Sequence, residues 1–217
     1  MLRLHDFPAS ANCYKVRLLL AQLGVDYERV PVDIFAGESQ TDEYRAMNPA
    51  GRTPVLELEN GETIAESGAI LLYLGEGTDL LPVERLGRAR AAQWLFFEQN
   101  LLEPNVGTAR FWLLTGRAEG NAEIVARCQA MGLAALGVLD AHLGSHEFLL
   151  GPRYSVADIG LYGYTHLAGD SGIDTDRFAA VGDWLARVRE TPRFMNDLED
   201  YPAHAHAGVA RSIHDTY

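Results

Sequence analysis

The sequence predicts an α/β domain at the N-terminus followed by an all-helical domain. Over the first 76 residues, short strand-like runs alternate with helical periodicity, in the order strand, helix, strand, short helix, hairpin and helix. After about residue 86 no convincing strand occurs, and apolar residues recur at the three- and four-residue spacing of helices. We therefore expect domains at residues 1–76 and 87–217, joined by a linker at 77–86.

The first 32 residues predict a parallel strand–helix–strand unit. Residues 2–4 alternate as a short strand, and Ser10 or Asn12 can cap the helix that follows. Gly24 is suited to end this helix, because glycine readily adopts the left-handed conformation after a last turn. Residues 27–32 form a second strand. Since a helix connects the two strands, they should pair in parallel as a right-handed unit.

The segment at residues 48–67 predicts a hairpin that leads into a helix. After an NPAG turn, Pro54 begins an apolar strand, where no ladder donor is needed. Asn60–Gly61 is a strong signal for a tight hairpin, and a second short strand follows it. Ser67 then stands where a helix begins, and the free N–H groups of a first helical turn suit a carboxylate. This order of elements is that of a thioredoxin-like domain.

The second half predicts a series of helices. A helical stretch at 84–114 carries Trp94, Phe97 and Leu101 on one face, and Pro104 should kink it because proline removes a backbone donor. An apolar stripe follows at steps of four and three residues: Ile124, Cys128, Met131, Ala135 and Val138.

A capping box marks the next helix. Ser155 can accept from the amide of Asp158, and Asp158 can reach back to the amide of Ser155. One more helix should cover residues 178–188 and end at Thr191–Pro192.

The composition excludes several classes of protein. A chain of 217 residues with 47% hydrophobic and 22% charged residues is typical of a globular protein. Its net charge of −12 disfavours nucleic-acid and anionic membrane surfaces. The sequence shows neither a signal peptide nor an apolar run that approaches the length of a membrane span. With two cysteines there is no disulfide framework, so we expect a cytoplasmic protein.

The pattern N-P-x-G-x-x-P-V-L, a hairpin and then E-S-x-A-I closely resembles the N-terminal half of cytosolic glutathione transferases. The segment S-x-A-D-I at 155–159 resembles the buried helix of their C-terminal domain. The resemblance implies that Pro54 is cis and that the backbone of Thr53 pairs with the cysteinyl part of glutathione. It also implies that Glu66 and Ser67 hold the γ-glutamyl end. Glutathione is then the co-substrate, and no metal is expected.

Glutathione chemistry requires a thiolate, whereas a free thiol with a pKa of about 8.5 is mostly protonated at pH 7. A hydroxyl or amide donor near a helix N-terminus favours the charged form. Ser10 matches the serine of theta- and zeta-like enzymes, and Ser10-x-Asn12 resembles the nu-class bacterial proteins, which reduce disulfides with glutathione. We expect Ser10 to stabilise the thiolate and Asn12 to be a second donor. Simple capping of the helix is the alternative.

Other residues near this loop leave alternatives open. Cys13 is either a nucleophile that forms mixed disulfides or a small buried residue, and Cys128 belongs to an apolar stripe. The zeta-class pattern expects a serine and a cysteine where Ala11 and Asn12 stand, which disfavours maleylacetoacetate isomerisation. Arg52 can reach the glycyl carboxylate of glutathione or can be a solvated loop charge.

Further candidates follow from the resemblance or from the tail. Ser39 or Gln40 can line the glycyl end of glutathione. The acceptor site of the family lies between its two domains, with candidates Arg110, Phe111 and Trp112. His204 and His206 form an H-x-H pair, and His214 follows later in the chain. A metal site would need a third ligand in defined geometry, so we interpret these histidines as part of the tail.

We therefore expect a homodimeric glutathione transferase that attacks a hydrophobic electrophile. Glutathione-dependent disulfide reduction of the nu type is the alternative chemistry. A non-enzymatic docking module, as in some translation elongation factors, is the alternative of another class. The full set of Ser10, Thr53–Pro54 and Glu66–Ser67 disfavours a docking module, because such a module does not need a ligand site.

Overall fold

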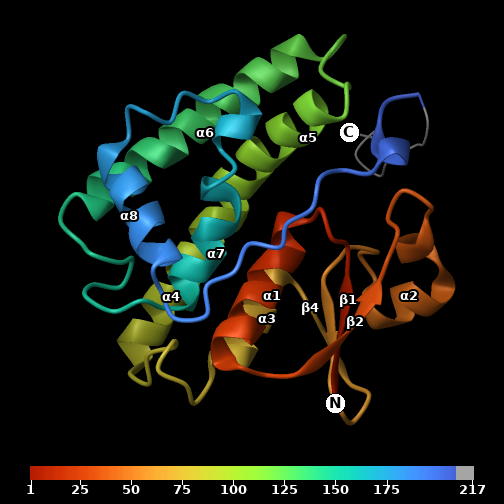
Figure 1. Cartoon of the computed structure of the whole chain (residues 1–217), viewed down its shortest axis with the longest axis horizontal. Helices are drawn as coiled ribbons and strands as arrows, with labels where there is room; N and C mark the ends of the chain where they lie inside the picture. Colours follow the sequence, from red (N-terminus) through yellow and green to blue (C-terminus); the bar gives the residue numbers. More distant parts are fainter. Residues whose placement is uncertain (209–217) are drawn as a thin grey trace. The chain divides into compact units, whose positions relative to one another are not determined.

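The computed structural model describes residues 1–208, which form two compact units (Figure 1). The first unit contains Met1–Leu74 together with the segment that begins at Met195, and the second contains Gly75–Phe194. The first unit has a four-stranded mixed sheet with helices, and the second is helical. The predicted fold class is therefore confirmed.

The first unit follows the predicted order of elements. Its strands are β1 (Leu2–Asp6), β2 (Tyr27–Pro31), β3 (Val55–Glu57) and β4 (Thr63–Ala65). Its helical elements are α1 (Ala11–Leu23), η1 (Glu38–Gln40), α2 (Asp42–Met47), α3 (Ser67–Gly75) and, in the C-terminal segment, η4 (Ala203–Ala205). The sheet order is β2-β1-β3-β4. As predicted, β1 and β2 are parallel and the β3–β4 hairpin is antiparallel.

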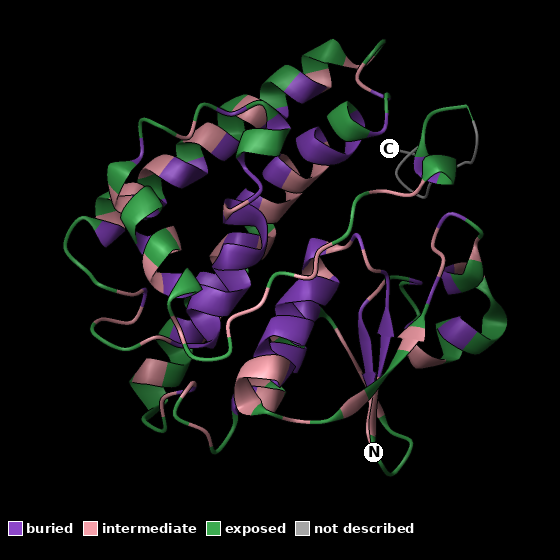
Figure 2. Ribbon diagram, in the orientation of Figure 1, coloured by how far each residue is buried: buried purple, intermediate pink, exposed green. Residues whose placement is uncertain are grey.

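The core of this unit lies between the sheet and its helices. Fully buried side chains from β1, α1, β3 and α3 pack together, namely Leu4, Val16, Leu20, Leu56 and Ile70. Figure 2 shows that α1 is buried along most of its length. Gly24 ends α1 with φ of 67°, which is the left-handed conformation that the sequence predicts for it.

The second unit contains α4 (Arg85–Phe97), the π-helix η2 (Glu98–Gly107), α5 (Thr108–Leu114), α6 (Ala122–Leu143), α7 (Val156–Thr165), η3 (Gly169–Ser171) and α8 (Ala179–Arg189). The predicted helical stretch at 84–114 is thus three consecutive helical elements, with Pro104 inside the π-helical part. Because proline lacks the donor that the α-helical ladder needs, the chain does not keep the α register around it.

Two predicted helix faces are wrong in part. Leu101 is 39% exposed, because the wider turns of η2 do not return every fourth residue to the same face. In α6, Met131 and Val138 are 47% and 53% exposed. The buried face of α6 is instead Val125, Cys128, Gly132, Ala135, Leu136, Leu139 and Leu143. This helix is apolar on several sides, so its period does not identify the side that packs.

Among the described residues, α6 is also the one helix with the length and apolar composition that a membrane crossing requires. Core helices of globular proteins share both properties. One face of α6 is buried, and the helix packs against η2, α5 and α8. The packed face of α6 therefore accounts for part of its apolar composition.

The predicted capping box at the start of α7 is present. The Asp158 carboxylate accepts from the backbone amides of Ser155 and Leu149, both at 2.9 Å, and from the Ser155 hydroxyl at 2.8 Å. It also accepts from Nε1 of Trp184 at 3.0 Å, so one buried carboxylate joins α7, the preceding loop and α8. Burial raises the pKa of Asp158 to about 6, although these donors act to lower it.

We expect Asp158→Ala to destabilise the protein by about 3–5 kcal/mol, because it leaves several buried donors without their acceptor. Urea unfolding followed by circular dichroism measures this change. The matched control is Asp183→Ala, which removes an exposed carboxylate from α8 and should cost less than about 0.5 kcal/mol. Equal effects of the two substitutions would contradict the structural role of Asp158.

Candidate functional site

The expected thiol-activating residue Ser10 is the N-cap of α1. Its backbone is extended, with φ of −82° and ψ of 120°, and its Oγ accepts from the amide of Cys13 at 3.3 Å. This bond uses the hydroxyl oxygen as an acceptor and leaves the O–H hydrogen to donate in another direction. Capping and thiolate stabilisation are therefore compatible in this geometry. Either role uses the position of Ser10 at the N-terminus of α1, which is the positive end of the helix dipole.

Asn12 connects the start of α1 to the start of α3. Its Oδ1 accepts from the hydroxyl of Ser67 at 3.2 Å and from Nζ of Lys15 at 2.7 Å. Ser67 and Lys15 are both buried. Because the amide oxygen accepts both donors, the Asn12 side chain is fixed with its oxygen toward them.

The loop before β3 is held through its carbonyl groups. The Arg52 carbonyl accepts from the Tyr44 hydroxyl at 3.1 Å and from Nδ2 of Asn48 at 2.8 Å. The Thr53–Pro54 peptide bond that follows is cis. The Arg52 side chain is exposed, whereas Pro54 is buried. The backbone next to Thr53 is thus fixed by two hydrogen bonds to the Arg52 carbonyl.

Glu66 precedes α3 in a strained conformation. Its φ is 68°, a left-handed value that is uncommon for a residue other than glycine, and its side chain is exposed. Its carbonyl accepts from the amide of Ile70 at 3.0 Å, so it lies where the helix begins. Such strain costs about 1–3 kcal/mol and is often found at ligand sites.

Cys13 fits the interpretation as a small buried residue better than that of a nucleophile. The side chain is completely buried, and its Sγ accepts from the amide of Phe7 at 3.4 Å. Burial and the charge of Asp6 raise the pKa of this thiol to about 12. Cys128 is also buried, on the packed face of α6, and burial raises its pKa too. The interpretation of Cys128 as a core residue is therefore confirmed.

The remaining candidates near the loop are used in local packing. Ser39 is buried, and Gln40 Nε2 donates to its Oγ at 3.1 Å and to the Gly51 carbonyl at 2.8 Å. Gln40 Oε1 accepts from Arg45 at 2.6 Å. Gln40 therefore links η1 to the loop that contains Arg52.

In the second unit, three residues of α5 that were candidates for the acceptor site are all buried: Arg110, Phe111 and Trp112. In the tail, His204 Nε2 lies 2.8 Å from Oδ2 of Asp33, and His206 is exposed. His214 lies outside the described residues. Within residues 1–208, no group of three or more His, Cys, Asp or Glu side chains could hold a metal ion.

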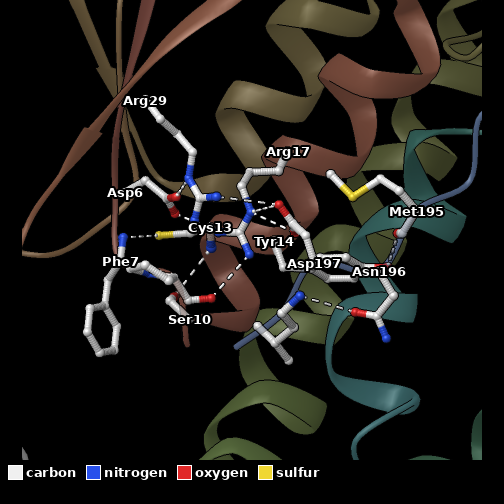
Figure 3. A network of polar contacts seen from close by, with 12 residues as sticks. Asp6, Phe7, Ser10, Cys13, Tyr14, Arg17, Arg29, Met195, Asn196 and Asp197 are labelled. Carbon is white, nitrogen blue, oxygen red and sulfur yellow. Dashed lines mark hydrogen bonds and ion pairs between the residues drawn. The ribbon is translucent and has the colours of Figure 1, made fainter. Parts of the chain in front are cut away.

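Sequence reasoning missed a charged network beside the site (Figure 3). Asp6 and Arg17 are fully buried and paired at 2.6 Å, and Asp197 of the C-terminal segment pairs with Arg17 at 2.9 Å. Burial acts to lower the pKa of Arg17, but the charges of Asp6 and Asp197 outweigh it and raise that pKa. The signal in the sequence was the two basic residues, Lys15 and Arg17, in an otherwise apolar helix.

Comparison with known families and proteins gives a consistent result. The model of the glutathione S-transferase N-terminal domain matches residues 4–79, and that of the C-terminal domain matches residues 122–203. Glutathione S-transferase 3 of Zea mays is 33% identical over 165 residues, which is 72% of this chain and 73% of the maize protein. The disulfide-bond oxidoreductase YfcG of Escherichia coli is 30% identical over 193 residues, 86% of this chain and 89% of YfcG.

Solved structures agree with the family models. A glutathione S-transferase from Pseudomonas fluorescens has a TM-score of 0.89 at 41% identity, covering 91% of this chain and 99% of its own. A glutathione transferase from Burkholderia graminis, with two glutathione molecules bound per subunit, has a TM-score of 0.79 at 29% identity, covering 88% of this chain and 85% of its own. Structural relatives of this chain therefore bind glutathione.

We expect iodoacetamide to leave Cys13 unmodified in the folded protein. With a pKa of about 12, only on the order of one thiol in 10⁴ is ionised at pH 8, and reagent access is blocked by burial. Mass spectrometry after short labelling at pH 8 measures this reaction. The control is the same reaction in urea, where both cysteines should be alkylated. Fast labelling of Cys13 in the folded protein would restore it as a candidate nucleophile.

Proposed function

This chain belongs to the glutathione S-transferase family and is a glutathione transferase, and we propose that it activates the glutathione thiolate for attack on a hydrophobic electrophile. In this proposal Ser10 and Asn12 hold the thiolate. Arg52, Thr53, Pro54, Glu66 and Ser67 hold the rest of glutathione.

The bond between Asn12 and Ser67 carries this proposal. These residues are 55 positions apart, and their side chains meet at 3.2 Å. Asn12 lies beside Ser10 at the N-terminus of α1, and Ser67 begins α3. The bond therefore joins the starts of two helices, which supports a single site for a ligand with a central thiol and an amino-acid end.

The two ends of glutathione meet different groups in this proposal. The backbone amides at the start of α3, that of Ser67 included, would bind the γ-glutamyl carboxylate, and the exposed Glu66 carboxylate would face its amino group. The backbone of Thr53 would pair with the cysteinyl part. The exposed Arg52 side chain offers a cation for the glycyl carboxylate.

The proposed reaction is nucleophilic substitution or addition by sulfur. Ionisation of the thiol releases a proton to solvent, and the Ser10 hydroxyl and the Asn12 amide would stabilise the anion. The thiolate then forms a carbon–sulfur bond with the electrophile, and the leaving group departs with the bonding electrons where one is present. Glutathione is consumed as a co-substrate.

Disulfide reduction is the second candidate function. The Ser10-x-Asn12 spacing and the 30% identity to YfcG, which is named a disulfide-bond oxidoreductase, favour it. In this reaction one glutathione thiolate attacks a disulfide and releases a thiol. A second glutathione then resolves the mixed disulfide, so that two glutathione molecules become one oxidised glutathione.

We also propose a cytoplasmic homodimer. Large apolar side chains are exposed on α4 and α6 of the helical unit and would be covered in a dimer: Leu86, Phe96, Met131 and Val138. The free, buried cysteines Cys13 and Cys128 are compatible with a reducing compartment.

Calorimetric titration with reduced and oxidised glutathione tests which chemistry applies. Tighter binding of reduced glutathione is the expected result for conjugation, because only one glutathione is then held. Tighter binding of oxidised glutathione would contradict conjugation as the proposed function and favour disulfide reduction. An absence of heat with both ligands at millimolar concentration would contradict the whole proposal.

We expect Ser10→Ala to raise the pKa of the bound glutathione thiol by about one unit or more, because a donor to the sulfur is lost and one unit corresponds to about 1.4 kcal/mol. The ultraviolet absorbance of the thiolate, measured against pH, reports this pKa. Ser10→Thr is the control that keeps the hydroxyl. An unchanged pKa in Ser10→Ala would transfer the role to Asn12.

A further inference from the structure

The C-terminal segment that begins at Met195 lies along the first unit next to the Ser10 loop (Figure 3). The Tyr14 hydroxyl donates to the Met195 carbonyl at 2.9 Å. Four residues later, the Glu199 amide donates to the Pro8 carbonyl at 3.3 Å. The segment is therefore attached both to α1 and to the loop between β1 and α1.

Arg17 joins this segment to the same loop. Its Nε donates to both carboxylate oxygens of Asp197, at 2.9 and 3.0 Å. One terminal nitrogen donates to Asp6 at 2.6 Å, and the other donates to the Pro8 carbonyl at 3.2 Å. Because the guanidinium is planar and its donors are fixed, its contact with Asp197 sets the direction of the donor that reaches Pro8.

The Pro8 carbonyl controls the turn that places Ser10. The Ser10 amide donates to the Phe7 carbonyl at 2.9 Å, so residues 7–10 form a turn with the Pro8–Ala9 peptide at its centre. The Pro8 carbonyl accepts from both Arg17 and the Glu199 amide. These two donors fix the plane of the central peptide, and a rotation of that plane would move Ser10.

We propose that residues 195–199 are a positioning element of the glutathione site, which holds Ser10 in place through Arg17 and the Pro8 carbonyl. This inference rests on the proposed role of Ser10 as thiolate stabiliser. Asp197 is the residue through which the segment acts. Its carboxylate is partly exposed, with 36% of the side chain accessible, and it also lies 3.6 Å from Nη1 of Arg29. Arg17 has a second carboxylate partner in the buried Asp6.

The test compares Asp197→Asn with Asp200→Asn. Both substitutions remove one negative charge from the same segment, and Asp200 is exposed. Reduced glutathione is the probe, and the pH dependence of thiolate absorbance gives the pKa of the bound thiol. We expect Asp197→Asn to raise this pKa by about 0.5–1 unit and Asp200→Asn to leave it unchanged.

Binding of S-methylglutathione separates positioning of Ser10 from general damage. This analogue has no thiol to ionise, so its Kd should change less than about twofold in Asp197→Asn. A second variant, Glu199→Pro, removes the amide donor to Pro8 without changing the network of Arg17. Glu199→Pro should also raise the pKa of the bound thiol. It therefore tests the proposal independently if Asp197→Asn folds poorly.

The double variant Ser10→Ala/Asp197→Asn separates the two proposals. If Asp197 acts through Ser10, the double variant has the same thiol pKa as Ser10→Ala alone. If Ser10→Ala raises the thiol pKa but Asp197→Asn and Glu199→Pro do not, the positioning role is overturned and the role of Ser10 stands. If Ser10→Ala has no effect either, the assignment of Ser10 is the part that fails.

Discussion

The buried ion pair between Asp6 and Arg17 is the constraint on which the site end of the first unit depends. Both side chains are excluded from solvent, and removing either partner would leave a buried charge whose remaining partner is only partly buried, namely Arg29 for Asp6 and Asp197 for Arg17. Asp6 is the last residue of β1, and Arg17 lies on the second turn of α1. The pair therefore joins the end of the strand to the helix, in addition to the apolar contacts of Leu4 with Val16 and Leu20.

This constraint determines where the polar groups of the site lie. With α1 fixed on β1, the turn at residues 7–10 places Ser10 at the helix N-cap. One turn later along the same helix, Lys15 supports Asn12, which meets Ser67 at the start of α3. The site thus depends on two helix starts and on the turn between β1 and α1. Its parts are polar, but the elements that carry them are held by apolar packing and by one buried ion pair.

The features predicted from the sequence depend on residues close together in the chain, whereas the missed features depend on contacts between residues far apart in the chain. Turn chemistry at Asn60–Gly61 and Gly24 and the capping box at Ser155 depend on residues a few positions apart, so they could be identified from the chain alone. The contact of Arg17 with Asp197 spans 180 positions and has no periodic signal. The packed side of α6 was also missed, because that helix is apolar around much of its circumference and only its neighbours decide which side is buried.

To bind an anionic tripeptide as proposed, a chain with a net charge of −12 would use local electrostatic fields rather than its overall charge. At physiological salt the Debye length is about 8 Å, so most surface carboxylates are screened from a ligand in the site. The N-termini of α1 and α3 and the ammonium of Lys15 act within that distance of Asn12 and Ser67. A small shift of either helix start would reduce this field, since the effect of a helix N-terminus is confined to its first turn. The exact docking of α1 therefore matters for anion binding as well as for the position of the Ser10 hydroxyl.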